Sequence, residues 1–470
     1  MSREKNSEDT NKKNIKRYLC IIIMEVLALG LALIILGEYK LSSDSAKISN
    51  KKNSEKAVET CVESLEIEKD ENAVEENGLK VVTPESTDSK EAKDREENTE
   101  EKNIEKKDDI TQKNLTKEEK EQLDKVNEII KNMTLEEKIC QMFIVSPEEL
   151  TNYNNVTAAG ENTKKAIEKY HVAGVVYFSG NIKSEEQLTK LLANTQQYAT
   201  ENNGIPMFLG IDEEGGDVAR LANNSQFNVT KFNKLSTVSS KEEAYKIGST
   251  IGKYLSRYGF NLDFAPDADV LTNKKNTVVK NRSFGTSSKK VTQYSKVYAQ
   301  GLNDNGVCAT YKHFPGHGAT AGDSHEGYAY TNKAYEQLEK TDLVPFIDGI
   351  KEGIDLIMVG HISVPKVIGD DTPSSLSKIM VTDILREKLG YEGVVITDAM
   401  NMGAISKNYT VEESATEAIK AGCDIILMPA DFRKAYNSLL KSVKSGDITE
   451  ERIEESVRRV LLLKQKRLNW

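Results

Sequence analysis

The sequence predicts an α/β fold for residues 119–470, in which eight strands alternate with helices. Short apolar runs recur along this region, and segments with apolar residues at a helical spacing of three to four fall between most of them. Glycines such as Gly259 and Gly422 close several of these helices ahead of the next strand. Eight buried strands with helical crossovers in about 350 residues are typical of a single (β/α)8 barrel of the TIM type. A doubly wound open sheet is the alternative.

The expected strands are apolar runs, most of which end in polar residues. They are residues 140–145, 174–178, 207–212, 262–266, 307–313, 356–361, 394–398 and 424–428. The clearest helices are 244–258, between the third and fourth strands, and 449–468, after the last one. In barrels of this type the catalytic groups lie at the carboxyl ends of the strands and on the loops that follow. The polar strand endings therefore predict one shared pocket.

The first 118 residues do not have the composition of a globular domain. Residues 1–17 are polar and end in a basic cluster, whereas 18–37 are almost continuously apolar, with Glu25 as the one charge. That length fits a membrane-spanning helix, and the preceding basic cluster predicts that 1–17 are a cytoplasmic tail. Residues 38–118 are dominated by charged and small polar side chains, which predicts a disordered linker. We therefore expect a single-pass membrane protein with the barrel outside the cell, or a secreted protein if the apolar run is a cleaved signal peptide.

The composition excludes some classes of partner. The net charge is −10, and no basic stripe is interleaved with aromatic residues, so nucleic acid is not an expected partner. The five cysteines show no metal-binding spacing, and Cys140, Cys308 and Cys423 fall in apolar stretches. We expect these three to be small core residues. Neither a metal nor an organic cofactor is expected.

Three of the five histidines lie in the segment 312–325, which reads KHFPGHGATAGDSH. Imidazole has an unperturbed pKa near physiological pH, so this loop is suited to proton transfer. Asp323 lies two residues before His325, and a carboxylate near an imidazole raises its pKa and fixes its tautomer. This pairing is typical of a general acid that later acts as a base. A metal site made by Asp323 with His313, His317 and His325 is the alternative, but the segment lacks a helical His-x-x-x-His or facial-triad spacing.

Asp398 directly follows the apolar run 393–397. A carboxylate at the end of a buried strand costs free energy unless it has partners. Carboxylates act as nucleophiles in glycosidases, where an oxocarbenium-like centre needs a negative neighbour and a leaving-group acid. Asp398 is therefore a candidate nucleophile, and a helix-capping aspartate is the alternative.

Four segments of the sequence resemble those of a known family. The segment 312–325 is similar to the signature of glycoside hydrolase family 3 β-N-acetylhexosaminidases. Three further stretches agree with the family and occur in its order: 212–216, 282–285 and 396–402. The resemblance extends over nearly all of 125–470.

The resemblance implies a retaining exo-β-N-acetylglucosaminidase with a TIM-type barrel and no cofactor. Asp398 would be the nucleophile, His325 the acid/base on a mobile loop, and Asp323 the residue that polarises His325. The residues implied to bind the N-acetylglucosamine (GlcNAc) ring are Asp212, Arg220, Arg282, Lys312 and His313. The sequence departs from the family at Asp217, where relatives usually have arginine, and this leaves the subsite detail open.

A histidine base also bears on the expected substrate. A neutral base does not repel an anionic leaving group or acceptor as a carboxylate would, and both the muramic acid of peptidoglycan and phosphate are anionic. We therefore expect a GlcNAc-containing saccharide or muropeptide as substrate. A β-glucosidase or a glycosyl phosphorylase on the same scaffold is one alternative, and a non-catalytic cell-wall-binding module is another.

Overall fold

The computed structural model describes residues 116–322, 329–468 and 470. The expected cytoplasmic tail, the apolar run 18–37, nearly all of the linker, and the loop residues Asp323 and His325 lie outside the described residues. Within the described ranges, no helix combines the length and apolar character needed to cross a membrane. The predicted anchor therefore stays a prediction.

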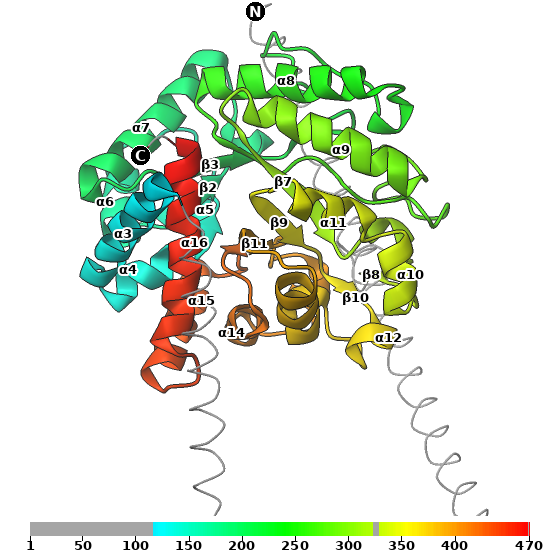
Figure 1. Ribbon diagram of the computed structural model, residues 1–470. Helices are drawn as coiled ribbons and strands as arrows, with labels where there is room; N and C mark the ends of the chain where they lie inside the picture. The colour runs from blue at the N-terminus through cyan, green and yellow to red at the C-terminus, as the bar shows by residue number, and fades with distance from the viewer. Residues whose placement is uncertain (1–115, 323–328, 469) are drawn as a thin grey trace, which may run out of the picture. The chain divides into compact units, whose positions relative to one another are not determined.

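The described chain forms an eight-stranded parallel barrel with helices around it (Figure 1). The first seven strands pair with one another in chain order, and the first strand also pairs with the last. A parallel bridge between Ile396 and Ile425 joins the seventh strand to the start of the eighth, so the barrel is nearly closed. The barrel strands are β1 (Phe143–Val145), β2 (Gly174–Val176), β3 (Phe208–Ile211), β6 (Leu262–Asp263), β7 (Cys308–Phe314), β9 (Leu356–Val359), β11 (Val394–Thr397) and β12 (Ile426–Leu427). The predicted barrel is confirmed, and the open-sheet alternative is excluded.

All eight predicted strands are present, but the first was predicted to begin too early. The prediction was 140–145, whereas Cys140 ends helix α4 (Leu135–Cys140) and the strand begins at Phe143. The reason is a capping box before the helix. The amide of Glu137 donates to Thr134 Oγ1 at 3.2 Å, and the amide of Thr134 donates to Glu137 Oε2 at 2.8 Å. These bonds start a helical turn that takes up the first residues of the apolar run.

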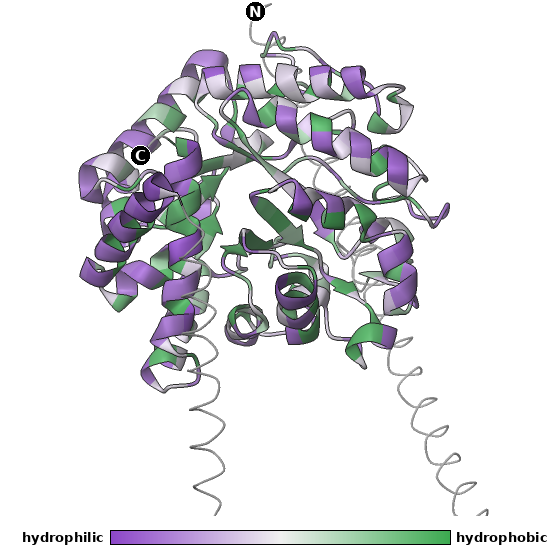
Figure 2. Cartoon of the chain, viewed as in Figure 1, coloured by the Kyte–Doolittle hydropathy of each residue, from purple (hydrophilic) through white to green (hydrophobic). Residues whose placement is uncertain are grey.

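The helices cover the outside of the barrel, and Figure 2 shows apolar residues concentrated on the strands and polar ones on many helical turns. The predicted helix 244–258 is α8, which ends where Gly259 adopts a positive φ of 103°. The larger helices are α3 (Lys117–Asn132), α6 (Glu161–Lys169), α7 (Glu185–Asn203), α8 (Lys241–Tyr258), α9 (Ser288–Asn303), α11 (Val344–Lys351), α14 (Val411–Ala421), α15 (Phe432–Lys444) and α16 (Glu450–Leu468). A π-helix (Ile379–Lys388) forms the crossover between β9 and β11. Shorter helical segments are α5 (Pro147–Thr151), α10 (Tyr335–Lys340), α12 (Pro365–Ile368) and α13 (Gly403–Ser406).

Two buried clusters make up the core, and the strands contribute to both by alternation. On β9, Leu356 and Met358 point into the barrel, whereas Ile357 and Val359 pack under the helices. Successive side chains of a strand face opposite sides, so a strand buried on both faces is apolar throughout. This explains why the barrel strands appear in the sequence as continuous apolar runs. Cys140, Cys308 and Cys423 are free and buried, as expected for small core residues.

Helix α16 closes the amino-terminal end of the barrel. Its Val460 and Leu463 belong to the cluster inside the barrel. Lys464 is fully buried there. Its Nζ donates to Gln141 Oε1 at 2.7 Å and lies 5.6 Å from the centre of the Phe208 ring. Burial lowers the pKa of Lys464 well below its ordinary value of 10.5.

We predict that Lys464→Met changes how stability depends on pH. Between the lowered folded-state pKa and the ordinary 10.5, the unfolded chain binds a proton at Lys464 that the folded chain does not. The unfolding free energy of the natural protein therefore rises with pH in this window, by at most about 1.4 kcal/mol per pH unit. The variant lacks this slope, so its stability relative to the natural protein increases as pH falls from 10.5 to 8.

Denaturant unfolding at several pH values measures this effect. Lys117→Met is the matched control, because it makes the same substitution at a lysine whose side chain is 92% exposed. A constant difference between Lys464→Met and the natural protein over the whole pH range would contradict the assignment.

Candidate active site

A cavity of about 520 Å³ opens at the carboxyl ends of the barrel strands. Six of the eight predicted site residues line it: Asp212, Arg220, Arg282, Lys312, His313 and Asp398. Asp212 follows β3, Lys312 and His313 lie near the end of β7, and Asp398 follows β11. The remaining two, Asp323 and His325, lie outside the described residues. The polar strand endings therefore do meet in one pocket, while the roles assigned to them stay predictions.

A buried ion cluster forms one wall of the cavity. Lys312 Nζ lies 2.8 Å from Asp212 Oδ1 and 2.7 Å from Glu214 Oε1. Arg282 makes a two-point contact with Glu214, from Nε to Oε2 at 2.8 Å and from Nη2 to Oε1 at 2.6 Å. Burial alone would raise the pKa of Glu214, but Arg282 and Lys312 outweigh it and hold the carboxyl ionised. Burial would likewise lower the pKa of Lys312, but Asp212 and Glu214 raise it overall.

An irregularity in β7 brings two consecutive side chains into the same cavity. Neighbouring residues of a regular strand face opposite sides, yet Lys312 and His313 both line the pocket. The pairing of β7 with β9 shifts register between Tyr311 and Phe314, which is the part of the strand that carries these two residues. Register irregularities of this kind redirect side chains and are common beside active sites.

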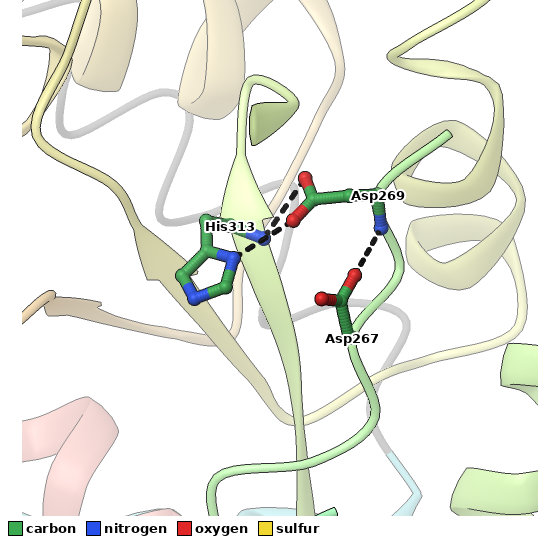
Figure 3. Close-up of side chains that lie close together, drawn as sticks. All are labelled: Asp267, Asp269 and His313. Carbon is green, nitrogen blue, oxygen red and sulfur yellow. Dashed lines mark hydrogen bonds and ion pairs between the residues drawn. The ribbon is translucent and has the colours of Figure 1, made fainter. Parts of the chain in front are cut away.

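His313 is held in one orientation by two aspartates behind it (Figure 3). Its Nδ1 lies 2.8 Å from Asp269 Oδ2, and the amide of Asp269 donates to Asp267 Oδ1 at 2.9 Å. Arg282 Nη2 lies 3.4 Å from His313 Nε2. Because arginine can only donate, Nε2 acts as an acceptor and Nδ1 carries the hydrogen that is donated to Asp269. Burial, with Arg282 nearby, lowers the pKa of His313 to about 4, so the imidazole is neutral at pH 7.

The same three residues are the candidate metal site of the described chain. One ligand atom each from Asp267, Asp269 and His313 lie within 4.8 Å of one another. A cation faces one of these carboxylates, and backbone amides face the other. Arg282 Nε lies 3.6 Å from Asp267 Oδ2, and Asp269 Oδ1 accepts the amides of His313 at 3.3 Å and His317 at 2.5 Å. Burial also raises the pKa of both aspartates, which favours their protonated forms. The residues therefore suit a hydrogen-bonded support for His313 better than a divalent cation.

Asp398 is partly exposed to the cavity. Its Oδ1 accepts the amide of Ala399 at 2.8 Å. Burial raises the pKa of Asp398, but His313, His361, the Ala399 amide and Lys312 more than offset this, and the pKa is lowered. The carboxylate is therefore ionised at neutral pH and faces the pocket, as a nucleophile must.

Arg220 is positioned from behind by a buried carboxylate. Glu213 accepts the amides of Arg220 at 2.5 Å, Leu221 at 2.9 Å and Ala222 at 2.9 Å, and the hydroxyl of Tyr254 at 2.8 Å. These bonds fix the backbone that carries Arg220. The guanidinium then lies over the Phe178 ring at 5.6 Å and 3.4 Å from Asp212 Oδ2.

Sequence reasoning missed several residues of this site. Glu214 is the acceptor shared by both buried cations, yet it received no role, although it lies within the segment 212–216. Asp269 orients His313 and was also missed. The sequence did offer a signal for these residues, which is the number of acidic side chains near strand ends. Asp263, Asp267 and Asp269 lie at or just after β6, and Asp212 directly follows β3.

The structure is a parallel barrel, and titratable side chains are gathered at the carboxyl ends of its strands. This arrangement is that of a barrel enzyme that acts on a polar substrate. The family model described as the glycosyl hydrolase family 3 N terminal domain matches residues 134–463. The chain therefore belongs to glycoside hydrolase family 3. The resemblance found in the sequence is confirmed at the level of the family.

Named relatives agree with this family. The chain is 31% identical to beta-hexosaminidase A of Pseudoalteromonas piscicida over 335 residues, covering 66% of this chain and 56% of that protein. It is 32% identical to beta-hexosaminidase LpqI of Mycobacterium tuberculosis over 311 residues, covering 64% of this chain and 78% of that protein. A family 3 beta-N-acetylglucosaminidase structure from Paenibacillus sp. FPU-7 has a TM-score of 0.67 at 38% identity, covering 72% of this chain and 63% of that one. The match thus spans less than two thirds of the Pseudoalteromonas and Paenibacillus proteins.

We predict that His313 stays in the neutral Nδ1–H form from pH 8 down to about pH 5. The physical reason is that burial and Arg282 lower its pKa to about 4, while the unfolded chain takes up this proton near the ordinary 6.5. The contribution of His313 therefore lowers the free energy of unfolding as pH falls from 6.5 towards 4.

Nitrogen-15 spectra of labelled histidine, assigned by comparison with His313→Gln, measure the tautomer directly. The chain unfolded in urea at each pH is the control in which the same histidine titrates near 6.5. Protonation of His313 in the folded protein with a midpoint near 6.5 would contradict this account of the site.

Proposed function

We propose that this protein is a retaining exo-β-N-acetylglucosaminidase that hydrolyses non-reducing terminal GlcNAc through a covalent intermediate on Asp398. The proposal is supported by the names of the relatives and by the chemistry of the cavity. The observation that carries it is the state of Asp398, an ionised carboxylate at the end of β11 that is open to the pocket. A carboxylate there can form a bond to an anomeric carbon.

The proposed reaction has two steps. In the first, a carboxylate oxygen of Asp398 attacks the anomeric carbon while the glycosidic bond breaks, and the leaving oxygen takes a proton from His325. In the second, His325 removes a proton from water, the water oxygen attacks the anomeric carbon, and the bond to Asp398 breaks. Two inversions give net retention of the β configuration. Asp323 would polarise His325 in both steps.

The wall of the cavity supplies suitable partners for the hydroxyls of a sugar. His313 presents Nε2 as an acceptor, while Lys312, Arg282 and Arg220 are donors, and Asp212 accepts. Because these groups already hold one another in place, a sugar ring meets an ordered set of partners. We propose that they bind the GlcNAc ring, with Asp212 and Arg220 contacting the hydroxyls farthest from the scissile bond.

We propose further that the natural substrates are peptidoglycan fragments and that the apolar run 18–37 anchors the enzyme in the membrane, with the barrel outside the cell. The proposed histidine base, which adds no repulsion of its own towards muramic acid, and the basic cluster before the apolar run are the support for this. Release of the activity by protease added to intact cells tests the placement. Activity that is protected until the cells are lysed would reverse it.

We predict that the protein releases p-nitrophenol from p-nitrophenyl β-GlcNAc much faster than from the β-glucoside, and that inorganic phosphate does not accelerate turnover. A hydrolase uses water as the acceptor, so phosphate brings no gain and the product is free GlcNAc. Exhaustive chelation is expected to leave the rate unchanged, because Arg282 lies 3.6 Å from Asp267 Oδ2 and the His317 amide already donates to Asp269 Oδ1.

Three outcomes would redirect the proposal. Formation of GlcNAc 1-phosphate would indicate a phosphorylase, and faster cleavage of the glucoside would indicate a β-glucosidase. Binding of cell-wall saccharides without turnover would indicate a non-catalytic module.

We predict that Asp398→Ala loses several orders of magnitude in kcat/KM, because the nucleophile and the stabilising charge are removed together. A 5-fluoro glycosyl fluoride of GlcNAc is expected to leave a covalent adduct on the natural protein, found by mass spectrometry on the peptide that contains Asp398. Asp371→Asn, at an exposed aspartate, is the control for the loss of one carboxylate. Near-normal turnover by Asp398→Ala, or an adduct on another residue, would refute the assignment.

A further inference from the structure

An unpaired carboxylate lies at the opening of the cavity. Asp217 is exposed and lines the pocket, in the turn between the short strands β4 (Glu213–Gly215) and β5 (Val218–Ala219). Its Oδ2 accepts a hydrogen bond from Asn281 Nδ2 at 2.7 Å. Asp212 and Glu214 are paired with cations, whereas no cation of the described residues forms an ion pair with Asp217.

The position of this carboxylate is fixed from two sides. Gly215 and Gly216 precede it with φ values of 84° and 63°, a left-handed conformation that glycine adopts at low cost and that this turn requires. A Cβ added at Gly216 would lie 3.1 Å from the carbonyl oxygen of Asn233, so the turn also packs closely against the following loop. Asn281, the partner of Asp217, directly precedes Arg282 of the buried ion cluster.

The charge of the cavity lining is not balanced. Among the described residues, four carboxylates line it, those of Asp212, Glu214, Asp217 and Asp398, against the three cations Arg220, Arg282 and Lys312. His313 and His317 add no positive charge at neutral pH, since burial lowers the pKa of each to about 4. The three cations form ion pairs with Asp212 and Glu214. The negative charge that they leave unbalanced therefore includes that of Asp217, which is exposed at the opening.

The opening is where the leaving group must lie. If the terminal sugar sits over Asp398, against the buried wall of Lys312 and His313, the next sugar can extend only towards solvent. A charge on that sugar would then be close to Asp217. This step rests on the proposed glycosidase function.

We propose that Asp217 sets the preference for the leaving group by disfavouring a free carboxylate next to the scissile bond. The favoured substrates carry a neutral residue there, either GlcNAc or a muramic acid whose lactyl carboxyl is linked to a peptide as an amide. Fragments with a free lactyl carboxylate are the disfavoured class. Two like charges at a solvent-exposed site interact weakly, so the expected effect on the rate is about threefold to tenfold, and added salt reduces it.

Matched disaccharides test this assignment on the full chain. The probes are GlcNAc-β-1,4-MurNAc as the free acid and the same compound as its methyl amide, which differ in one charge. At low salt, the natural protein is expected to favour the amide in kcat/KM by about threefold to tenfold, and 1 M salt is expected to reduce the ratio towards one. In Asp217→Asn the ratio is expected to be near one already at low salt.

Glu121→Gln is the control, because it removes one negative charge from an exposed position on α3 and is expected to leave the ratio as in the natural protein. Two outcomes would overturn the role of Asp217 but not the proposed function. One is an equal ratio in Asp217→Asn and the natural protein, and the other is a natural protein that favours the free acid. Failure to cleave both disaccharides and p-nitrophenyl β-GlcNAc would overturn the proposed function as well. Hydrolysis of the p-nitrophenyl compound therefore separates the two outcomes.

Discussion

The sharing of Glu214 between two buried cations is the interaction on which the site depends. Lys312 comes from β7 and Arg282 from the loop before α9, while Glu214 lies on β4, so one carboxylate joins three separate segments. Removing a single partner of a buried ion pair leaves an uncompensated charge and costs about 3–5 kcal/mol. The contact is thus less a source of stability than a constraint that fixes the segments relative to each other.

The same cluster separates the carboxylates of the barrel into two groups. Glu214 and Asp398 have positive groups close enough to outweigh burial, and their pKa values are lowered. Asp263 and Asp267 are fully buried, and their pKa values are raised well above the ordinary range. Negative charge is therefore concentrated on groups that face or border the cavity, while the layer behind them tends to hold protons. A chain with this many acids at one end of a barrel avoids mutual repulsion in this way.

Much of the fold was accessible from the sequence because each barrel strand is buried on both faces and appears as an apolar run, as residues 394–397 do. The error at Cys140 arose because an apolar run beside a helix cap can extend either element, and only the Thr134–Glu137 bonds decide between them. For the site, strand-end residues such as Asp212 and Asp398 were found because topology alone brings strand ends together. The role of Asp269 and the Asp217–Asn281 contact were not found, because they depend on loop conformations that have no periodic pattern in the sequence. The acid/base role of His325 was predicted from its motif alone and stays a prediction.

The way the barrel closes has a consequence for when the protein can fold. β1 pairs with β12, Lys138 on α4 binds Glu450 and Glu454 on α16 at 2.8 and 2.7 Å, and Arg458 on α16 donates to Asn127 on α3 at 2.9 Å. The first and last described elements thus complete each other across some 300 residues of chain. A nascent chain still held by the ribosome has every cavity-lining residue before it has the helix that closes the barrel floor. Folding of the barrel is therefore completed only after α16 has been synthesised, and until then the chain stays incompletely folded.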